Sequence, residues 1–174
     1  GAAVLELARS GADLKGFATF HGGLKTPQGQ DYSKTLGKIL VMHGTADKAI
    51  TMDQFAELAR ELEAAGVDHE MITYGGAKHA FTVFGGTRYQ EAADKKSWKR
   101  FQAAVQNITG MKHVFPTHQG RAAESLLAQT RVRPGDIIPN NSHFDTTRAN
   151  IEYCGAVALN LPCTEAFDTA AEAP

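Results

Sequence analysis

The 174-residue sequence predicts an α/β fold with a parallel sheet of about three strands and helices packed around it. Helical and extended patterns alternate over the first hundred residues, as in parallel sheets. The run KILVMH at residues 38–43 has an unbroken apolar centre, which is typical of a strand covered on both faces. The pattern restarts after Gly110, and this indicates a second, shorter α/β segment.

The first part of the chain contains start and stop signals for its elements. Thr51 and Gln54 have the spacing of a capping box, and Gly66 follows the last helical position of that segment. A long apolar stripe at helical spacing later runs up to Gly110. The expected elements are helices over 1–11, 51–66 and 89–110 and strands over 16–21, 38–43 and 70–74.

The second part shows the same kinds of signal over shorter segments. An extended piece is expected over 112–115, helices over 119–130 and 146–153, and strands over 136–139 and 156–161. The sequence contains neither an internal repeat nor a low-complexity linker. We therefore expect two parts, residues 1–100 and 101–174, joined through the long helix and not through a flexible tether.

Composition and charge exclude several classes of partner. The chain is 43% hydrophobic with a net charge of −1, and the two parts carry +1 (13 basic, 12 acidic) and −2 (5 basic, 7 acidic). Neither value suggests a nucleic-acid or anionic-membrane surface. No apolar run approaches the roughly 20 residues that span a bilayer, and no signal-peptide pattern is seen. A cytoplasmic protein without nucleic-acid or membrane partners is the expectation.

The two cysteines, Cys154 and Cys163, do not have the spacing of metal ligands, so no metal site is expected. A disulfide between them is the alternative. Two buried, reduced cysteines are the favoured interpretation.

Asp47 and His79 each follow a predicted strand, in the order Asp then His. At the carboxyl edge of a parallel sheet, Asp47 would accept the imidazole N–H of His79 and stabilise its charged form, and His79 would take a proton from a nucleophile. Alternatively, Asp47 is a turn residue and His79 a surface loop residue. The order and the positions at two consecutive strand ends favour an acid–base pair.

Four strings of the first part resemble the dienelactone hydrolase family in sequence order: FHGGL (20–24), VMHGTAD (41–47), YGGAKHAFT (74–82) and ADKKSWKRF (93–101). The resemblance covers residues 1–100. It implies a partial α/β-hydrolase sheet and an ester or lactone hydrolase without a cofactor, with Asp47 and His79 as catalytic residues. The best-known members carry an arginine shortly after the histidine to hold a substrate carboxylate, but Ala80–Phe81–Thr82–Val83 follow here. This departure implies a branch of the family with another substrate.

A nucleophile is not found in the sequence. The resemblance implies an elbow G-x-C-x-G-G, and Gly1-Ala2-Ala3 is similar to its last residues, which would put the nucleophile shortly before Gly1. Ser10, Ser33 and Ser97 have no elbow sequence around them. An acid and a base without a nucleophile are not expected to hydrolyse esters at a useful rate.

Gln119, Gly120 and Arg121 begin a predicted helix and have the composition of an anion-binding turn. A helix start with a surface arginine is the alternative. The strings AVQNITGMKHVFPTHQGRAAE (104–124) and IPNNSHFDTTRANIE (138–152) resemble the tryptophanase and tyrosine phenol-lyase family. That resemblance implies a partial aminotransferase-like segment using pyridoxal phosphate, with Gln119, Gly120 and Arg121 at the cofactor phosphate. It also implies that Phe144 stacks on the pyridine ring and that Asp145 lies near an amino-acid substrate, although Phe144 alone reads as a core aromatic.

The lyase family also needs a lysine that forms a Schiff base and an aspartate that pairs with the pyridinium nitrogen. Both belong to strands beyond the matching segment, and Lys112 precedes the phosphate cup. We therefore expect at most binding of phosphate or free cofactor here.

Three functions are consistent with these motifs. The first is a hybrid of a hydrolase fragment and a lyase fragment, catalytically incomplete as it stands. The second is an ester or lactone hydrolase that works when an elbow upstream of Gly1 is present, and the third is a noncatalytic module that binds phosphate or pyridoxal phosphate. Because a parallel sheet without its preceding strands has an unpaired edge, we also expect self-association, or docking of strand 156–161 onto that edge.

Overall fold

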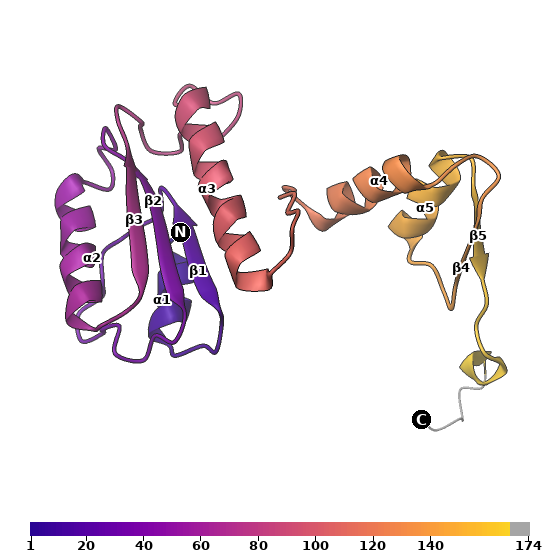
Figure 1. The fold of residues 1–174 in the computed structure, drawn as a ribbon, viewed down its shortest axis with the longest axis horizontal. Helices are drawn as coiled ribbons and strands as arrows, with labels where there is room; N and C mark the ends of the chain where they lie inside the picture. The colour runs from indigo at the N-terminus through magenta and orange to yellow at the C-terminus, as the bar shows by residue number, and fades with distance from the viewer. Residues whose placement is uncertain (168–174) are drawn as a thin grey trace. The chain divides into compact units, whose positions relative to one another are not determined.

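The computed structural model describes residues 1–167, and the chain forms two compact units, Gly1–Val114 and Phe115–Pro174 (Figure 1). The elements of the first unit are helices α1 (Ala2–Arg9), α2 (Met52–Ala64) and α3 (Glu91–Thr109) and strands β1 (Gly16–Phe20), β2 (Lys38–Gly44) and β3 (His69–Tyr74). Helix α3 crosses residue 100 and lies wholly within this unit.

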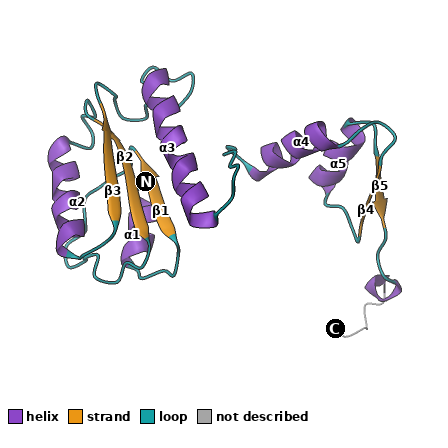
Figure 2. Ribbon diagram, viewed as in Figure 1, coloured by secondary structure: helices purple, strands orange, loops and turns teal. Residues whose placement is uncertain are grey.

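The first unit contains a parallel sheet in the order β1-β2-β3 (Figure 2). Its central strand is β2, and every residue of β2 after Lys38 is buried. The α/β class and the three parallel strands predicted from the sequence are therefore confirmed. Strands β1 and β3 are the two edges of this sheet, since each pairs with β2 alone among residues 1–167.

Helices cover both faces of this sheet. Helices α1 and α2 pack on one face, where the buried side chains are Leu5, Ala8, Phe17, Leu24, Tyr32, Ile39, Val41, Leu58, Leu62 and Val67. Helix α3 covers the other face (Figure 1), where Leu40, Met42, Tyr74, Ala77, Phe81 and Ala93 are buried. Alternate residues of β2 point into the two clusters, which is the period-2 arrangement of a strand.

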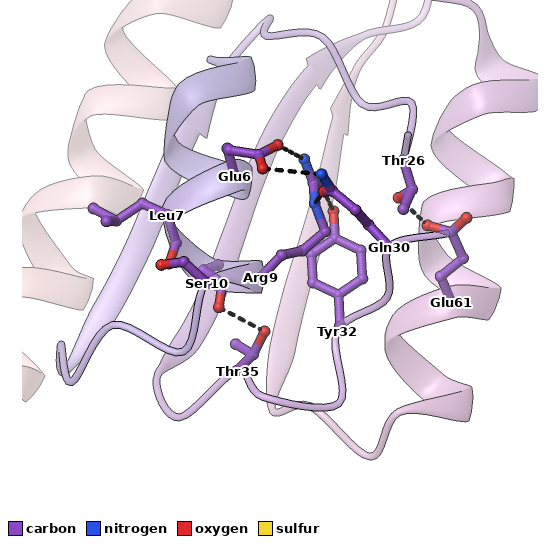
Figure 3. A network of polar contacts seen from close by, with 10 residues as sticks. Glu6, Leu7, Arg9, Ser10, Thr26, Gln30, Tyr32, Thr35 and Glu61 are labelled. Atoms are coloured by element: carbon purple, nitrogen blue, oxygen red, sulfur yellow. Dashed lines mark hydrogen bonds and ion pairs between the residues drawn. The ribbon is translucent and has the colours of Figure 1, made fainter. Parts of the chain in front are cut away.

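A buried arginine holds α1 to the long segment between β1 and β2. The Arg9 guanidinium donates hydrogen bonds to Gln30 Oε1 at 2.7 Å, to the Tyr32 hydroxyl at 2.8 Å and to Glu6 Oε2 at 2.7 Å (Figure 3). Arg9 is 8% exposed and Tyr32 1% exposed. Because a buried charge is tolerated only when it is paired and hydrogen-bonded, these partners keep the start of the sheet and α1 in one arrangement.

Most of the helix start and stop signals are confirmed. Thr51 is the N-cap of α2, and its hydroxyl accepts the Gln54 N–H at 3.4 Å. The reciprocal half of the capping box is wrong, because the Gln54 side-chain oxygen is buried without a partner. Gly110 ends α3 with φ 71°, a left-handed conformation that favours glycine.

The second unit consists of α4 (Gly120–Arg131), β4 (Ile137–Asn140), α5 (Asp145–Tyr153), β5 (Val157–Asn160) and a 3₁₀ turn, η1 (Thr164–Phe167). Strands β4 and β5 form a two-stranded parallel sheet. Segment 156–161 contains β5, and the partner of β5 within the second unit is β4. Residues 112–115, predicted as an extended piece, belong to no strand.

The core of the second unit is small: Ile151, Ala156 and Ala158 are buried, with Val132 and Ile138 packed against them. Cys154 and Cys163 are both free thiols, but Cys154 is only half-buried and Cys163 is exposed, so the expectation of two buried cysteines is wrong. Among residues 1–167, no helix combines the length and apolarity that crossing a membrane requires.

Candidate functional site

Asp47 is held by the turn that follows β2. Its Oδ1 accepts the backbone N–H groups of Ala49 and Ile50, both at 2.9 Å. Asp47 is 6% exposed, and its carboxylate is removed from solvent. The turn thus fixes one carboxylate oxygen and leaves Oδ2 for another partner.

His79 lies on the loop after β3, and its Nδ1 donates to Asp47 Oδ2 at 2.8 Å. Two contacts hold the two strand-end loops together: Ala46 N–H donates to the Ala77 carbonyl at 2.9 Å, and Gly76 N–H donates to Thr45 Oγ1 at 2.8 Å. The structure therefore brings together the two residues that the sequence analysis paired.

The electrostatics of Asp47 favour its charged form. Burial is the largest influence and raises the pKa of Asp47, but the hydrogen bonds from Ile50, His79 and Ala49 together outweigh it, so the pKa lies below its ordinary value. A carboxylate at Asp47 accepts the Nδ1–H of His79. The Nε2 lone pair of the His79 ring is then available to take a proton.

His43 holds the turn that carries Asp47 through a hydrogen bond to Ile50. This side chain is fully buried, its ring stacks on Phe55 with centroids 5.5 Å apart, and its Nε2 donates to the Ile50 carbonyl at 3.0 Å. Burial lowers the pKa of His43. Ile50 therefore links a neutral buried imidazole to the carboxylate, because its carbonyl accepts from His43 while its N–H donates to Asp47.

A third histidine, His21, touches His79. It follows β1 with φ 39°, and the ring centroids of His21 and His79 are 5.4 Å apart in an edge contact. His21 Nε2 lies 2.9 Å from the Thr82 hydroxyl, and its ring also meets the edge of Phe81. Burial lowers the pKa of His21, and the nearby His79 lowers it further.

The beginning of α1 lies against the same loop. A methyl group on Gly22 would sit 2.3 Å from the Gly1 Cα and 2.4 Å from Thr19 Oγ1. Only glycine fits so close an approach of two backbones. Gly1 is thus packed beside the residue that follows His21.

A cavity of about 490 Å³ adjoins His79, and its lining residues are Ala46, Lys48, Ala49, Lys78, His79 and Arg88. Lys48, Lys78 and Arg88 form no ion pair or hydrogen bond within residues 1–167. The cavity beside the histidine is therefore positively charged. These three cations could not be predicted from the sequence, because lysine and arginine on loops give no periodic signal.

In the second unit, Gln119 is the N-cap of α4, and Gly120 and Arg121 open its first turn. A side chain at Gly120 would meet no atom within 4 Å, and Arg121 forms no ion pair or hydrogen bond with any described residue. Backbone N–H groups at a helix start together with a free guanidinium suit a phosphate.

Phe144 and Asp145 open α5, and two hydrogen bonds join the first turn of α5 to the start of α4. Glu124, one turn into α4, accepts from the hydroxyls of Thr146 at 3.0 Å and Thr147 at 3.2 Å. Phe144 is 66% exposed and not the core aromatic that the residue pattern alone favoured. The first turns of α4 and α5 therefore lie close together.

Lys112 is the one lysine after residue 100, and it precedes α4. Within residues 1–167, no group of three or more histidine, cysteine, aspartate or glutamate side chains could hold a metal ion.

Two family models match this chain. The model described as the dienelactone hydrolase family matches residues 1–109, and the model described as beta-eliminating lyase matches residues 77–173. The two matches overlap over residues 77–109, which include His79 and helix α3.

Two tryptophanases are among the curated relatives of this chain. A tryptophanase of Hyphomonas neptunium is 42% identical over 129 residues, covering 67% of this chain and 28% of the relative. A tryptophanase of Rhodobacter capsulatus is 51% identical over 76 residues, covering 44% of this chain and 17% of the relative. The chain thus spans less than a third of these two relatives.

A solved structure matches the hydrolase side. A dienelactone hydrolase-like promiscuous phosphotriesterase from metagenomic libraries is 30% identical with a TM-score of 0.55, covering 60% of this chain and 46% of that chain. Less than half of that hydrolase fold is therefore matched here.

Proposed function

Residues 1–109 belong to the dienelactone hydrolase family and residues 77–173 to the beta-eliminating lyase family, and from this we propose that the first unit carries the acid–base pair of a carboxylic-ester or lactone hydrolase. The observation that carries the proposal is the 2.8 Å contact between His79 Nδ1 and Asp47 Oδ2. Asp47 holds the His79 tautomer, and His79 Nε2 takes the proton of a nucleophile and returns it to the leaving group.

The nucleophile is the missing part of this proposal. The printed sequence has no elbow of the form G-x-C-x-G-G, so these 174 residues alone are proposed to be catalytically incomplete. The hydrolase is proposed to become complete when an elbow is joined ahead of Gly1. The packing of Gly1 on Gly22, next to His21 and so near His79, supports that position.

The substrate is proposed to be a small ester or lactone that carries negative charge. Lys48, Lys78 and Arg88 beside His79 support this, since three unpaired cations at one cavity favour an anionic group. Arg88 reaches the cavity from the loop before α3, although no arginine stands in the positions directly after His79.

Hydrolysis of p-nitrophenyl acetate tests the proposal. The 174-residue chain is compared with a chain that carries Gly-x-Cys-x-Gly-Gly ahead of Gly1, and only the extended chain is expected to hydrolyse the ester. In the extended chain, His79→Ala should lower kcat/KM by about 10²–10⁴-fold, the range for a general base. Turnover by the unextended chain would contradict the proposal. So would an extended chain whose kcat/KM is unchanged by His79→Ala.

A second proposed function belongs to residues 101–174, a noncatalytic site for phosphate or pyridoxal phosphate. Its support is the free Arg121 guanidinium beside Gly120 at the start of α4. Gln119, Gly120 and Arg121 would hold the phosphate, Phe144 would stack on the ring, and Asp145 would face an amino acid. When bound in its family, the cofactor acts as an electron sink for carbanions. Without the required lysine, this chain is proposed to bind but not to eliminate.

Absorbance spectroscopy tests this second function. Addition of pyridoxal phosphate should shift the visible absorbance, and Arg121→Ala should abolish the shift. Arg131→Ala, which removes an arginine from the last turn of the same helix, is the matched control and should leave it intact. An equal shift in wild type and Arg121→Ala would contradict the proposal.

A further inference from the structure

His21 and Ala80 are the two non-glycine residues with positive φ in the part of the chain that the structure describes, at 39° and 63°. Such a conformation is uncommon for side chains other than glycine and costs free energy, so it persists only where surrounding contacts fix it. Both residues adjoin His79: Ala80 follows it in sequence, and His21 touches its ring. The strain is thus concentrated around one imidazole.

The side chain of His21 bridges two parts of the histidine loop. Its Nε2 and the Thr82 hydroxyl are 2.9 Å apart, and either group can donate. Its ring meets the edge of Phe81, which is fully buried and also contacts Tyr74 of β3. His21 is therefore anchored to the core on one side and presents its ring to His79 on the other.

Three groups that carry or can carry charge face His21 in this arrangement: His79, Asp47 and the amino group of Gly1. Burial and the neighbouring His79 lower the pKa of His21, which keeps its imidazole neutral near pH 7. Asp47 contacts His79 and not His21. A neutral ring held this way can confine His79 without competing for the carboxylate.

We propose that His21 is a positioning residue for His79, which holds the histidine loop through Thr82 and confines the His79 ring by edge contact so that Nδ1 stays on Asp47. This inference rests on the proposed role of the Asp47–His79 pair. It assigns roles to His21 and Thr82 that neither strand-end spacing nor the sequence motifs indicated.

Nuclear magnetic resonance of the imidazole nitrogens in the full 174-residue chain tests it without needing turnover. In wild type, His79 is expected as the Nδ1–H tautomer with a slowly exchanging proton. Thr82→Val removes only the hydroxyl, and His21→Phe keeps a ring but removes Nε2. Each should speed exchange of the His79 Nδ1 proton by about fivefold, the size expected for losing one neutral hydrogen bond. Each variant should also populate the Nε2–H tautomer of His79.

Matched variants separate positioning from general loss of structure. Thr87→Val, an exposed threonine in the same loop, should leave the His79 signals unchanged, and so should His118→Phe at an exposed position of the second unit. His21→Gln can still bond Thr82 and should retain much of the wild-type exchange rate. Because His21 and Thr82 act through one bond, the double variant should resemble either single variant. Thr82→Val keeps the test valid if His21→Phe does not fold.

Two results overturn the inference. One is a folded Thr82→Val chain whose His79 exchange and tautomer equal wild type, and the other is an equal change in Thr87→Val. Asp47→Asn distinguishes this failure from failure of the proposed function. If Asp47→Asn leaves the His79 tautomer unchanged, the acid–base pair itself is wrong. If Asp47→Asn alters the tautomer and Thr82→Val does not, only the role of His21 is wrong.

Discussion

At the scale of single residues, the Asp47 carboxylate combines burial with complete hydrogen bonding. It accepts from Ala49, Ile50 and His79, and these bonds outweigh the burial that would raise its pKa. A group whose pKa is lower in the folded chain releases its proton more readily there than in the unfolded chain. Its stabilising contribution is thus present above its ordinary pKa of about 3.9 and disappears as the pH falls through the folded value.

Asp47→Asn is therefore expected to lower the free energy of unfolding by about 1–3 kcal/mol at pH 7, the cost of disturbing a buried, hydrogen-bonded group. The difference from wild type should hold down to about pH 5 and shrink below about pH 4, where Asp47 of the unfolded wild-type chain begins to take up a proton, and it should be lost as the pH falls through the lower pKa of the folded chain. Urea unfolding at a series of pH values measures it. Other carboxyls with lowered pKa, such as Glu70, are present in both wild type and Asp47→Asn, so their contributions to the difference in unfolding free energy cancel.

Asp13→Asn is the control for that series, because Asp13 is exposed and makes no ion pair or hydrogen bond within residues 1–167. Its difference from wild type should be small at every pH. A constant difference for Asp47→Asn between pH 7 and pH 3 would show that the carboxylate charge makes no contribution.

At the scale of elements, the ends of β2 and β3 determine how close the two loops come. Gly44 is the last residue of β2 and pairs with Tyr74, and a methyl group on Gly44 would lie 2.3 Å from the Ala77 carbonyl oxygen. Backbone atoms cannot yield as a flexible side chain can. Gly44 therefore permits the contact between the loops that carry Asp47 and His79.

Gly44→Ala is expected to push the two loops apart and to destabilise the first unit by about 1–3 kcal/mol, the usual cost of forcing extra atoms into a packed site. The His79 Nδ1–H signal should weaken along with the melting temperature. Gly75→Ala is the matched control, since a methyl group there meets no atom within 4 Å. Equal melting temperatures for the two variants would show that the close approach is not needed.

The elements of the first unit were predictable because each has a local signal. The apolar run of β2, the Thr51 cap and the strand ends before Asp47 and His79 can all be read from neighbouring residues. His21 could not be found this way, because its partner Thr82 is 61 positions away and its φ of 39° follows from tertiary contacts.

Two contacts of the chain differ from what local patterns predict. A capping box predicts both hydrogen bonds, but the side-chain oxygen of Gln54 is buried without a partner. The strand near residues 156–161 is correctly placed in sequence, but its pairing with β4 was not predicted. Strand pairing depends on contacts between distant residues, and period-2 patterns do not specify it.

At the scale of the whole molecule, each unit has surfaces that its own elements do not cover. His21, just after β1, donates its N–H to β2, and the carbonyl of Lys15, just before β1, accepts a hydrogen bond from the first residue of β2. The odd-numbered residues of β1 therefore bond toward β2. The N–H of Ala18 therefore faces the free edge of β1. Beside that edge is an apolar cavity of about 420 Å³ between the sheet and α3, and Ala18 is among its lining residues.

We expect the chain to self-associate through the β1 edge, because an unpaired strand edge is a template for another strand. Sedimentation over a range of concentrations should show an average mass that rises with concentration. Ala18→Pro removes the outward N–H without removing a bond to β2, and its ring can enter the adjoining cavity. This variant should stay closer to a monomer.

Val157→Lys is the control for association through the second unit, because Val157 is 54% exposed on β5. If the β1 edge is responsible, Val157→Lys should associate as wild type does. A wild-type mass that is independent of concentration would contradict self-association itself. Association that is lost in Val157→Lys but kept in Ala18→Pro would assign it to the small sheet of the second unit, whose exposed strands then become the surface that joins two copies.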